Sequence, residues 1–134
     1  MKKKISGFTL IEIMTVIAVM ALLIAIMFPQ FWRAYSKSRY TACISNLKNI
    51  ATALQIYSTE NNSFPESLDD LNPDYLKIIP ACPEAAADTY TAGYEVDDQG
   101  TIFTICCKGH FHALLGYDED EPYYRSSSGL GPKH

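Results

Sequence analysis

The sequence predicts an α+β protein in which one long N-terminal helix, membrane-spanning in its first half, packs with its second half on a small antiparallel sheet. Three observations predict this fold. Residues 8–28 form an apolar run that contains one charged residue. Residues 40–57 repeat apolar side chains at helical spacing, and residues 90–107 contain two strand-like segments around a turn. About 100 residues follow the first 30, which is enough for one small domain with one core.

The apolar run is long enough to cross a bilayer as a helix. Its 21 residues would span roughly 31 Å at about 1.5 Å per residue, close to the roughly 30 Å hydrocarbon core of a bilayer. The run ends in AIMFPQFWRAYSK, which lacks the small-residue cleavage site of a secretory signal. Three lysines at residues 2–4 precede the run, and Arg33, Lys37 and Arg39 follow it. The tight lysine cluster, together with the α-amino group, favours a cytoplasmic N-terminus.

Glu12 is the charged residue in this run. A carboxylate at the middle of a membrane helix costs roughly 2.5–3.5 kcal/mol on insertion scales, and less near the interface. Glu12 lies about one turn inside the run, so part of this cost remains to be compensated. One interpretation is a side chain that reaches back to the lipid head groups, and the other is a positively charged partner within the membrane.

The segment GFTLIEIMTVIA, preceded by a short basic leader, resembles the processing site of type IV pilins and of the pseudopilins of type II secretion systems. The resemblance implies a prepilin leader at residues 1–7, a transmembrane assembly helix at residues 8–31 and a periplasmic or extracellular head at residues 32–134. It also implies cleavage between Gly7 and Phe8 by a prepilin peptidase, followed by N-methylation of Phe8. Pro29 falls where pilins place a helix-bending proline.

The same resemblance implies that Glu12 sets the register between subunits. Cleavage would leave a protonated amine on Phe8, and the Glu12 carboxylate of a neighbouring subunit would neutralise it, because unpaired charges are costly at low dielectric. The implied product is a homo- or hetero-oligomeric filament of pilin-like subunits, extracted from the bacterial inner membrane by an assembly platform. We expect a single pass through the lipid bilayer, with a cytoplasmic N-terminus and a periplasmic head.

The helix is expected to kink at Pro29 and to continue to about residue 59. Beyond the proline, apolar residues recur at spacings of three and four, which indicates a helix face on a core: Tyr40, Cys43, Leu47, Ile50, Leu54 and Tyr57. Asn61 or Asn62 suits a left-handed helix cap. Residues 65–71 predict a short helix, and residues 72–73 a turn.

Residues 90–96 and 101–107 predict a β-hairpin with its turn at residues 97–100. In the second strand Phe103, Ile105 and Cys107 share one face, and this face is expected to pack on the long helix. Residues 116–134 show no clear period and predict loop and a disordered tail.

The four cysteines would lie on the outer side of the membrane, where disulfides form. We expect a disulfide between Cys82 and Cys107, with Cys106 as the alternative partner, since adjacent strand residues point to opposite faces. Cys43 is expected to be a buried thiol or the partner of the remaining strand cysteine. Four cysteines allow three complete pairings, so the connectivity stays open.

No cofactor is expected. The segment CCKGHFH offers soft-metal donors at His110 and His112, but no C-x-x-C pair accompanies them, so we expect loop histidines rather than a zinc or copper site. Asp118 and Asp120 lie in the acidic run DEDE and are the candidate oxygen donors for calcium. Major pseudopilins as a family have a calcium site in this region, but their local pattern is not found here, and a solvated acidic loop is the expectation.

The composition narrows the function further. Of the charged residues, 11 are basic and 15 acidic, and without the lysines at residues 2–4 the formal charge is −7, which argues against a nucleic-acid partner. No pattern of nucleophile, base and orienting acid indicates an enzyme. The sequence predicts a structural subunit of a type IV pilus-like filament, more specifically a type II secretion pseudopilin. The alternative is a membrane-anchored extracytoplasmic domain that binds ligands or handles metal through His110, His112 and the acids.

Overall fold

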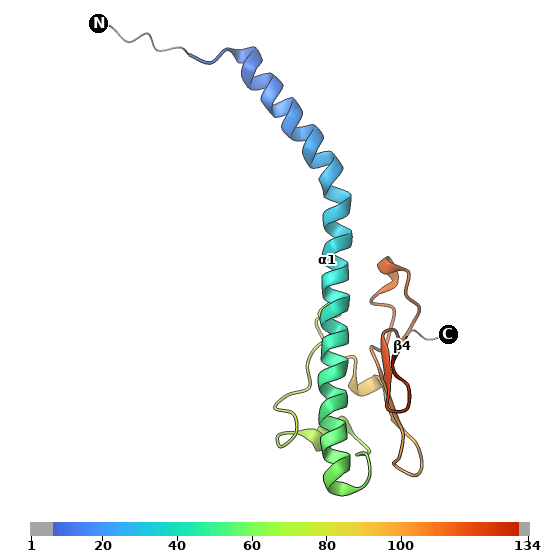
Figure 1. Ribbon diagram of the computed structural model, residues 1–134. Coiled ribbons are helices and arrows are strands. Elements are labelled where there is room, and N and C mark those ends of the chain that lie inside the picture. Colours follow the sequence, from blue (N-terminus) through green and yellow to red (C-terminus); the bar gives the residue numbers. More distant parts are fainter. Residues whose placement is uncertain (1–6, 132–134) are drawn as a thin grey trace, which may run out of the picture. The chain divides into compact units, whose positions relative to one another are not determined.

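The computed structural model describes residues 7–131. The lysines at residues 2–4 and most of the predicted leader therefore lie outside the described residues. The chain divides into two units, Met1–Ala34 and Tyr35–His134. Helix α1 (Leu10–Asn61) contributes its first half to one unit and its second half to the other (Figure 1).

The first unit consists of the apolar beginning of α1. Thr9 precedes the helix, and its Oγ1 accepts a 3.4 Å hydrogen bond from the backbone N–H of Glu12, as an N-cap residue does. The assigned helix runs through Pro29, so the kink stays a prediction. The segment has a mean hydropathy of 2.7 in a window long enough to cross a membrane, and none of that window is buried within the chain.

In the second unit, α1 presents the predicted face to the core. Cys43, Leu47, Ile50 and Leu54 are all fully buried, which confirms the helical stripe. The helix ends at Asn61, and Asn62 follows with φ of 60°. This left-handed residue is the expected cap, because asparagine tolerates the conformation better than most residues.

The connection after the helix contains a short 3₁₀ helix, η1 (Leu68–Leu71), in place of the helix predicted over residues 65–71. It begins later than predicted because Ser67 forms its N-cap, with a capping box completed by Asp70. Leu68 and Leu71 are fully buried, so this turn closes one end of the core.

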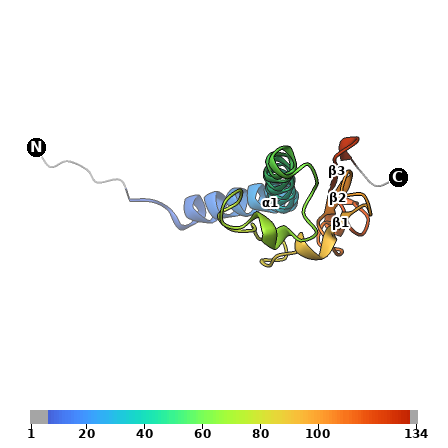
Figure 2. The ribbon, with the colours of Figure 1, turned by 90° about the horizontal axis from the view of Figure 1, so that it is seen from below.

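The second unit contains a four-stranded antiparallel sheet in the order β1-β2-β3-β4. Its strands are β1 (Tyr94–Val96), β2 (Phe103–Cys106), β3 (Tyr123–Arg125) and β4 (Gly129–Gly131). Seen along the second half of α1, strands β1, β2 and β3 lie together on one side of the helix (Figure 2). The predicted hairpin is confirmed, with Val96 opposite Phe103.

Two predictions about the sheet are wrong. The first strand does not begin at residue 90, because the Asp88 carboxylate accepts hydrogen bonds from the backbone N–H groups of Tyr90 and Thr91, and this local turn leads into the 3₁₀ helix η2 (Thr91–Gly93). The tail is not loop throughout, because β3 pairs with β2 and with β4. Strands of three residues are too short to show a recognisable period.

The core lies between the sheet and the second half of α1. Phe103 and Ile105 of β2 are fully buried, whereas Ile102 is 44% exposed, which confirms the predicted inward face. The Phe103 ring packs edge-on against Phe64 at 4.7 Å between centroids, and stacks on Tyr124 at 6.0 Å. Strands β2 and β3 and the loop after α1 thus meet at one aromatic cluster.

Leu54→Ala should destabilise the head by about 2–5 kcal/mol, because it removes a fully buried side chain and leaves a cavity. The measurement is denaturant unfolding of the full chain in detergent micelles. Gln55→Ala, on the exposed side of the same helix turn, is the control and should change stability by no more than about 0.5 kcal/mol. Equal losses in both variants would contradict the described helix face.

The β1–β2 turn is held by Asp97. Its Oδ1 accepts hydrogen bonds from the backbone N–H groups of Thr101 and Ile102 at 2.6 and 2.8 Å, and its Oδ2 accepts one from the Thr101 hydroxyl at 2.7 Å. The bond from Ile102, followed by the one from the Thr101 hydroxyl, lowers the pKa of Asp97. The ionised carboxylate therefore stabilises the folded head above the unfolded pKa, and this stabilisation is lost as the pH falls through the lower folded pKa.

Asp97→Asn should accordingly lower the melting temperature at neutral pH. The difference from the parent chain should shrink as the pH falls below about 4, the ordinary pKa of aspartate, because the parent then loses the same charge. Thermal melts across this range measure the difference. A deficit that stays constant with pH would show that the charge of Asp97 does not stabilise the turn.

Candidate functional site

The first candidate site is the assembly segment, defined here as residues 7–12. A Cβ built on Gly7 would meet no atom within 4 Å, so the fold of the chain itself does not require glycine there. Phe8 is 77% exposed, and Glu12 is also exposed in the first turn of α1. The segment is therefore open to a processing enzyme and to neighbouring subunits.

The position of Glu12 in the helix has an electrostatic consequence. Its backbone N–H bonds to Thr9, which makes it the third residue of the helix. A carboxylate in the first turn lies near the partial positive charge of the helix N-terminus and is stabilised there by about 0.3–1 kcal/mol. Within residues 7–131 Glu12 forms no ion pair, so a cation from outside these residues can pair with it.

Apolar side chains continue from the assembly segment along the helix. The large apolar side chains of residues 8–32 are 47–77% exposed in the isolated chain. A contiguous apolar surface of this length is not stable in water and must be covered by lipid or by protein. Phe28 and Trp32 pack edge-on at 6.2 Å, at the end of this surface.

The second candidate site is the cysteine–histidine cluster, defined as Cys43, Cys82, Cys107 and His112. All four are buried, and their sulfur atoms and imidazole nitrogen lie within 4.8 Å of one another. The Sγ atoms of Cys82 and Cys107 are 3.4 Å apart with no bond between them, whereas a disulfide requires about 2.05 Å. The predicted disulfide between them therefore stays a prediction.

The environment of the cluster favours protonated thiols in the absence of a metal. Hydrogen bonding with Cys43, followed by burial, raises the pKa of Cys107 to about 12. Burial is also the main cause that raises the pKa of Cys82. These cysteines are thus poor nucleophiles as they stand, which argues against a catalytic thiol.

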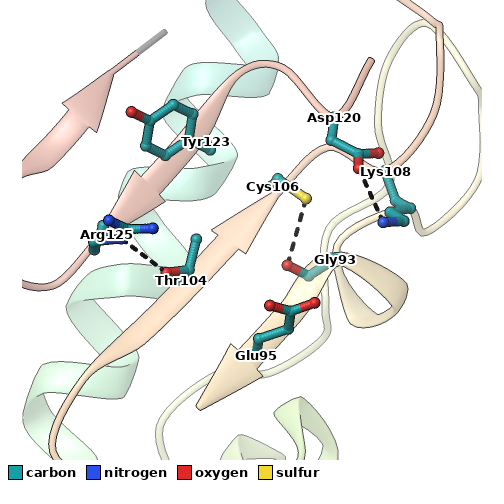
Figure 3. A pocket seen from close by; sticks show the side chains of 8 residues that line it. All are labelled: Gly93, Glu95, Thr104, Cys106, Lys108, Asp120, Tyr123 and Arg125. Atoms are coloured by element: carbon teal, nitrogen blue, oxygen red, sulfur yellow. Dashed lines mark hydrogen bonds and ion pairs between the residues drawn. The ribbon is translucent and has the colours of Figure 1, made fainter. Parts of the chain in front are cut away.

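Cys106 and His110, also considered from the sequence, lie apart from the cluster. The Cys106 Sγ donates to the carbonyl oxygen of Gly93 at 3.5 Å, on the face of β2 opposite to Cys107 (Figure 3). His110 is exposed and forms an ion pair with Glu119 at 3.2 Å. The two histidines of CCKGHFH therefore do not act together, because His112 is buried and His110 faces solvent.

The face of the sheet that carries Cys106 holds an open polar depression of about 340 Å³ (Figure 3). Lys108 Nζ lies 2.9 Å from Asp120 Oδ2, while the backbone N–H of Gly109 donates to the other oxygen at 3.0 Å. Asp118 contributes its backbone N–H to Glu121. The carboxylate of Asp120 is thus held by Lys108 and Gly109, and the expectation of a solvated acidic loop without calcium stays a prediction.

The sequence alone did not predict the four-residue cluster. The sequence predicts a disulfide between Cys82 and Cys107, and its spacing groups His112 with His110. The position of each cysteine in the sequence gives a signal. Cys43 lies on the core face of the helix, and Cys107 directly follows β2 and continues its inward alternation with Phe103 and Ile105. The second half of α1 and the β2 segment face the same core. Each places a cysteine on that core, so the two cysteines come close together.

Comparison with known proteins gives two kinds of similarity. Residues 2–28 match the family described as the prokaryotic N-terminal methylation motif. The chain is 34% identical over 99 residues to the type II secretion system core protein G of Pseudomonas aeruginosa, covering 61% of this chain and 70% of that protein. It is 28% identical to the protein of the same name from Pectobacterium carotovorum, and this match covers 81% of this chain and 70% of that protein. It is also 33% identical to the type IV wide pilus major component PilA4 of Thermus thermophilus, and this match covers 56% of this chain and 57% of that protein.

Proposed function

Because the chain belongs to the family of type IV pilins and pseudopilins, we propose that it is a pseudopilin, a subunit of the filament of a type II secretion system. The family consists of structural subunits of filaments and not of enzymes. The chain is accordingly a pilin-like filament subunit, anchored in a membrane by the apolar part of α1.

One observation carries the choice of pseudopilin. The similarity to the two secretion proteins covers 61% and 81% of this chain and 70% of each relative, so it extends well beyond the methylation motif into the head. The similarity to the pilus component covers 57% of that relative. Since the head distinguishes members that share one assembly helix, the longer matches favour secretion over a surface pilus.

We further propose that the precursor lies in the inner membrane with its head in the periplasm and is cut after Gly7. The exposed assembly segment supports this step, because a peptidase must bind it in an extended form. A glycine that the fold does not require suits recognition, since a peptidase pocket that contacts the backbone leaves no room for a side chain. N-methylation of Phe8 and extraction by an assembly platform complete the proposed pathway.

Assembly would then proceed by pairing of charges between subunits. The new amine on Phe8 lies one residue before the N-cap Thr9, and Glu12 lies in the first helical turn. Pairing of the amine of one subunit with the carboxylate of the next neutralises two charges that are costly in lipid. Because the pair is short-ranged, it also sets the axial step between neighbouring helices.

Top-down mass spectrometry of the protein from native membranes should give a mass that begins at N-methylated Phe8. Gly7→Val should instead retain residues 1–7, because the side chain blocks the peptidase, while Ile11→Val should be processed as the parent is. In cells with an active prepilin peptidase, a parent chain that retains residues 1–7 would overturn the filament proposal.

Glu12→Gln should be processed normally but should fail to assemble, because the substitution keeps the size of the side chain and removes its charge. In a strain that lacks the native chain, it should abolish the release of secreted proteins into the medium, and Glu12→Asp should restore part of it. The readouts are secreted activity and the presence of surface pili. Loss of surface pili with secretion intact, in the strain that lacks the chain, would assign the subunit to a pilus.

A further inference from the structure

We propose that Cys43, Cys82, Cys107 and His112 form a binding site for one Zn²⁺ ion in the core of the head. The proposal is independent of the choice between pilus and secretion system, because it concerns the head of a single subunit. Three thiolates and one imidazole are an established ligand set for structural zinc.

The geometry of the cluster matches a tetrahedral ion. With zinc–sulfur bonds of about 2.3 Å and a zinc–nitrogen bond of about 2.0–2.1 Å, tetrahedral ligand atoms lie about 3.5–3.8 Å from one another. The four ligand atoms here all lie within 4.8 Å of one another, and the Sγ atoms of Cys82 and Cys107 are 3.4 Å apart. Shifts of about an ångström or less would therefore complete the coordination shell.

An unsatisfied polar atom points to the missing ligand. The Nε2 atom of His112 is buried and has no hydrogen-bond partner in the described part of the chain, while the residue is only 3% exposed. A buried polar atom without a partner costs about 1–3 kcal/mol, so such atoms are rare in native folds. The Tyr40 ring packs edge-on against the imidazole at 5.1 Å and restricts its orientation. An imidazole nitrogen of His112 lies within 4.8 Å of the three sulfurs, and coordination of a cation by Nε2 would remove the deficit.

Two of the three sulfur atoms, those of Cys43 and Cys107, also have a hydroxyl group within hydrogen-bond distance. The Tyr90 hydroxyl donates to Cys43 Sγ at 3.1 Å. Asn46 Nδ2 donates in turn to the tyrosine oxygen at 3.3 Å, which leaves the hydroxyl proton directed at the sulfur. Donors of this kind stabilise the negative charge of metal-bound thiolates and fix their orientation.

The other two sulfurs are contacted by separate groups. Cys82 Sγ accepts a hydrogen bond from the Cys107 thiol at 3.4 Å. The Thr89 hydroxyl lies 3.2 Å from Cys107 Sγ and becomes the donor when that sulfur is a thiolate. The outer shell of a thiolate site is thus already in place on Cys43 and Cys107.

The ligand set identifies the metal by its chemistry. Three sulfurs and a nitrogen favour a borderline-soft cation over calcium or magnesium, which prefer oxygen ligands. On binding, each of the three thiols releases one proton to solvent and forms one zinc–sulfur bond, and the neutral imidazole donates a lone pair. The resulting site carries one net negative charge, which the donors to sulfur offset.

The ion would join four separate segments of the head. Its ligands come from α1, from the loop before η2, from the residue after β2, and from the residue before η3 (Ala113–Leu115). A head of about 100 residues has a small core, and domains of this size commonly gain stability from metal ions or disulfides. Zinc would serve here as a structural cross-link.

The test is metal analysis of the full-length chain, purified in detergent from cells supplied with zinc. The parent chain should contain about one zinc ion, and cobalt substitution should give the intense visible bands and the thiolate charge-transfer band of a tetrahedral site. Cys82→Ser and His112→Ala should lose the metal. Cys106→Ala should retain it, because that side chain lies on the opposite face of β2.

His112→Cys guards against a variant that simply fails to fold, since a four-cysteine site still binds zinc and should restore the metal content. Removal of zinc by a chelator should expose three additional thiols to alkylation in the parent chain. A metal-free parent with a disulfide between Cys82 and Cys107 would overturn the proposal, and so would a metal-free parent with reduced thiols. Equal zinc in the parent, Cys82→Ser and His112→Ala would show that the ion binds elsewhere.

Discussion

The exposed apolar surface of residues 8–28 is the constraint on which the rest of the molecule depends. Each large apolar side chain removed from water contributes about 1.5–3 kcal/mol, so a surface of this size holds the chain in a membrane until other subunits cover it. Lipid tails are as apolar as leucine, however, and the hydrophobic effect therefore adds little when one helix replaces lipid around another. Assembly within the membrane needs a directional interaction, and the proposed pair of the Phe8 amine and the Glu12 carboxylate would provide one.

The head meets a different constraint, because one helix must face lipid or other subunits in its first half and a folded core in its second. The second half satisfies this with a stripe of buried residues. Cys43, Leu47, Ile50 and Leu54 are fully buried, and Ala51 and Ala53 are nearly so, while Lys48, Asn49 and Thr52 on the other side remain exposed. The sheet covers that stripe, and Phe103 and Ile105 supply the opposing surface. Because the core has few buried side chains, the contacts at its ends contribute a larger fraction of the stability of the head.

Local patterns predicted those parts of the fold that local physics determines. The buried helix stripe follows from helical periodicity, the cap at Asn62 from its tolerance of positive φ, and the inward face of β2 from strand alternation. The strands β3 and β4 could not be predicted, since three-residue strands are defined by their pairing with β2 and with each other. The cysteine–histidine cluster likewise depends on tertiary contacts, because its ligands come from four segments spread over residues 43–112. The spacing in CCKGHFH predicts that His110 and His112 would act as a pair of ligands. Their burial in the fold distinguishes them, because His112 is buried and His110 is exposed.

The arrangement around the cluster bears on whether its sulfurs are built for a metal or for a disulfide. A disulfide between Cys82 and Cys107 would account for two of the four groups and would leave neutral sulfurs that gain little from hydrogen-bond donors. The structure places hydroxyl groups beside Cys43 and Cys107, and such a disulfide would not include Cys43. It also places an imidazole nitrogen of His112 among them, and the buried Nε2 of that residue has no hydrogen-bond partner in the described part of the chain. A cation bound by all four groups explains the donors and the histidine together, whereas a disulfide explains neither.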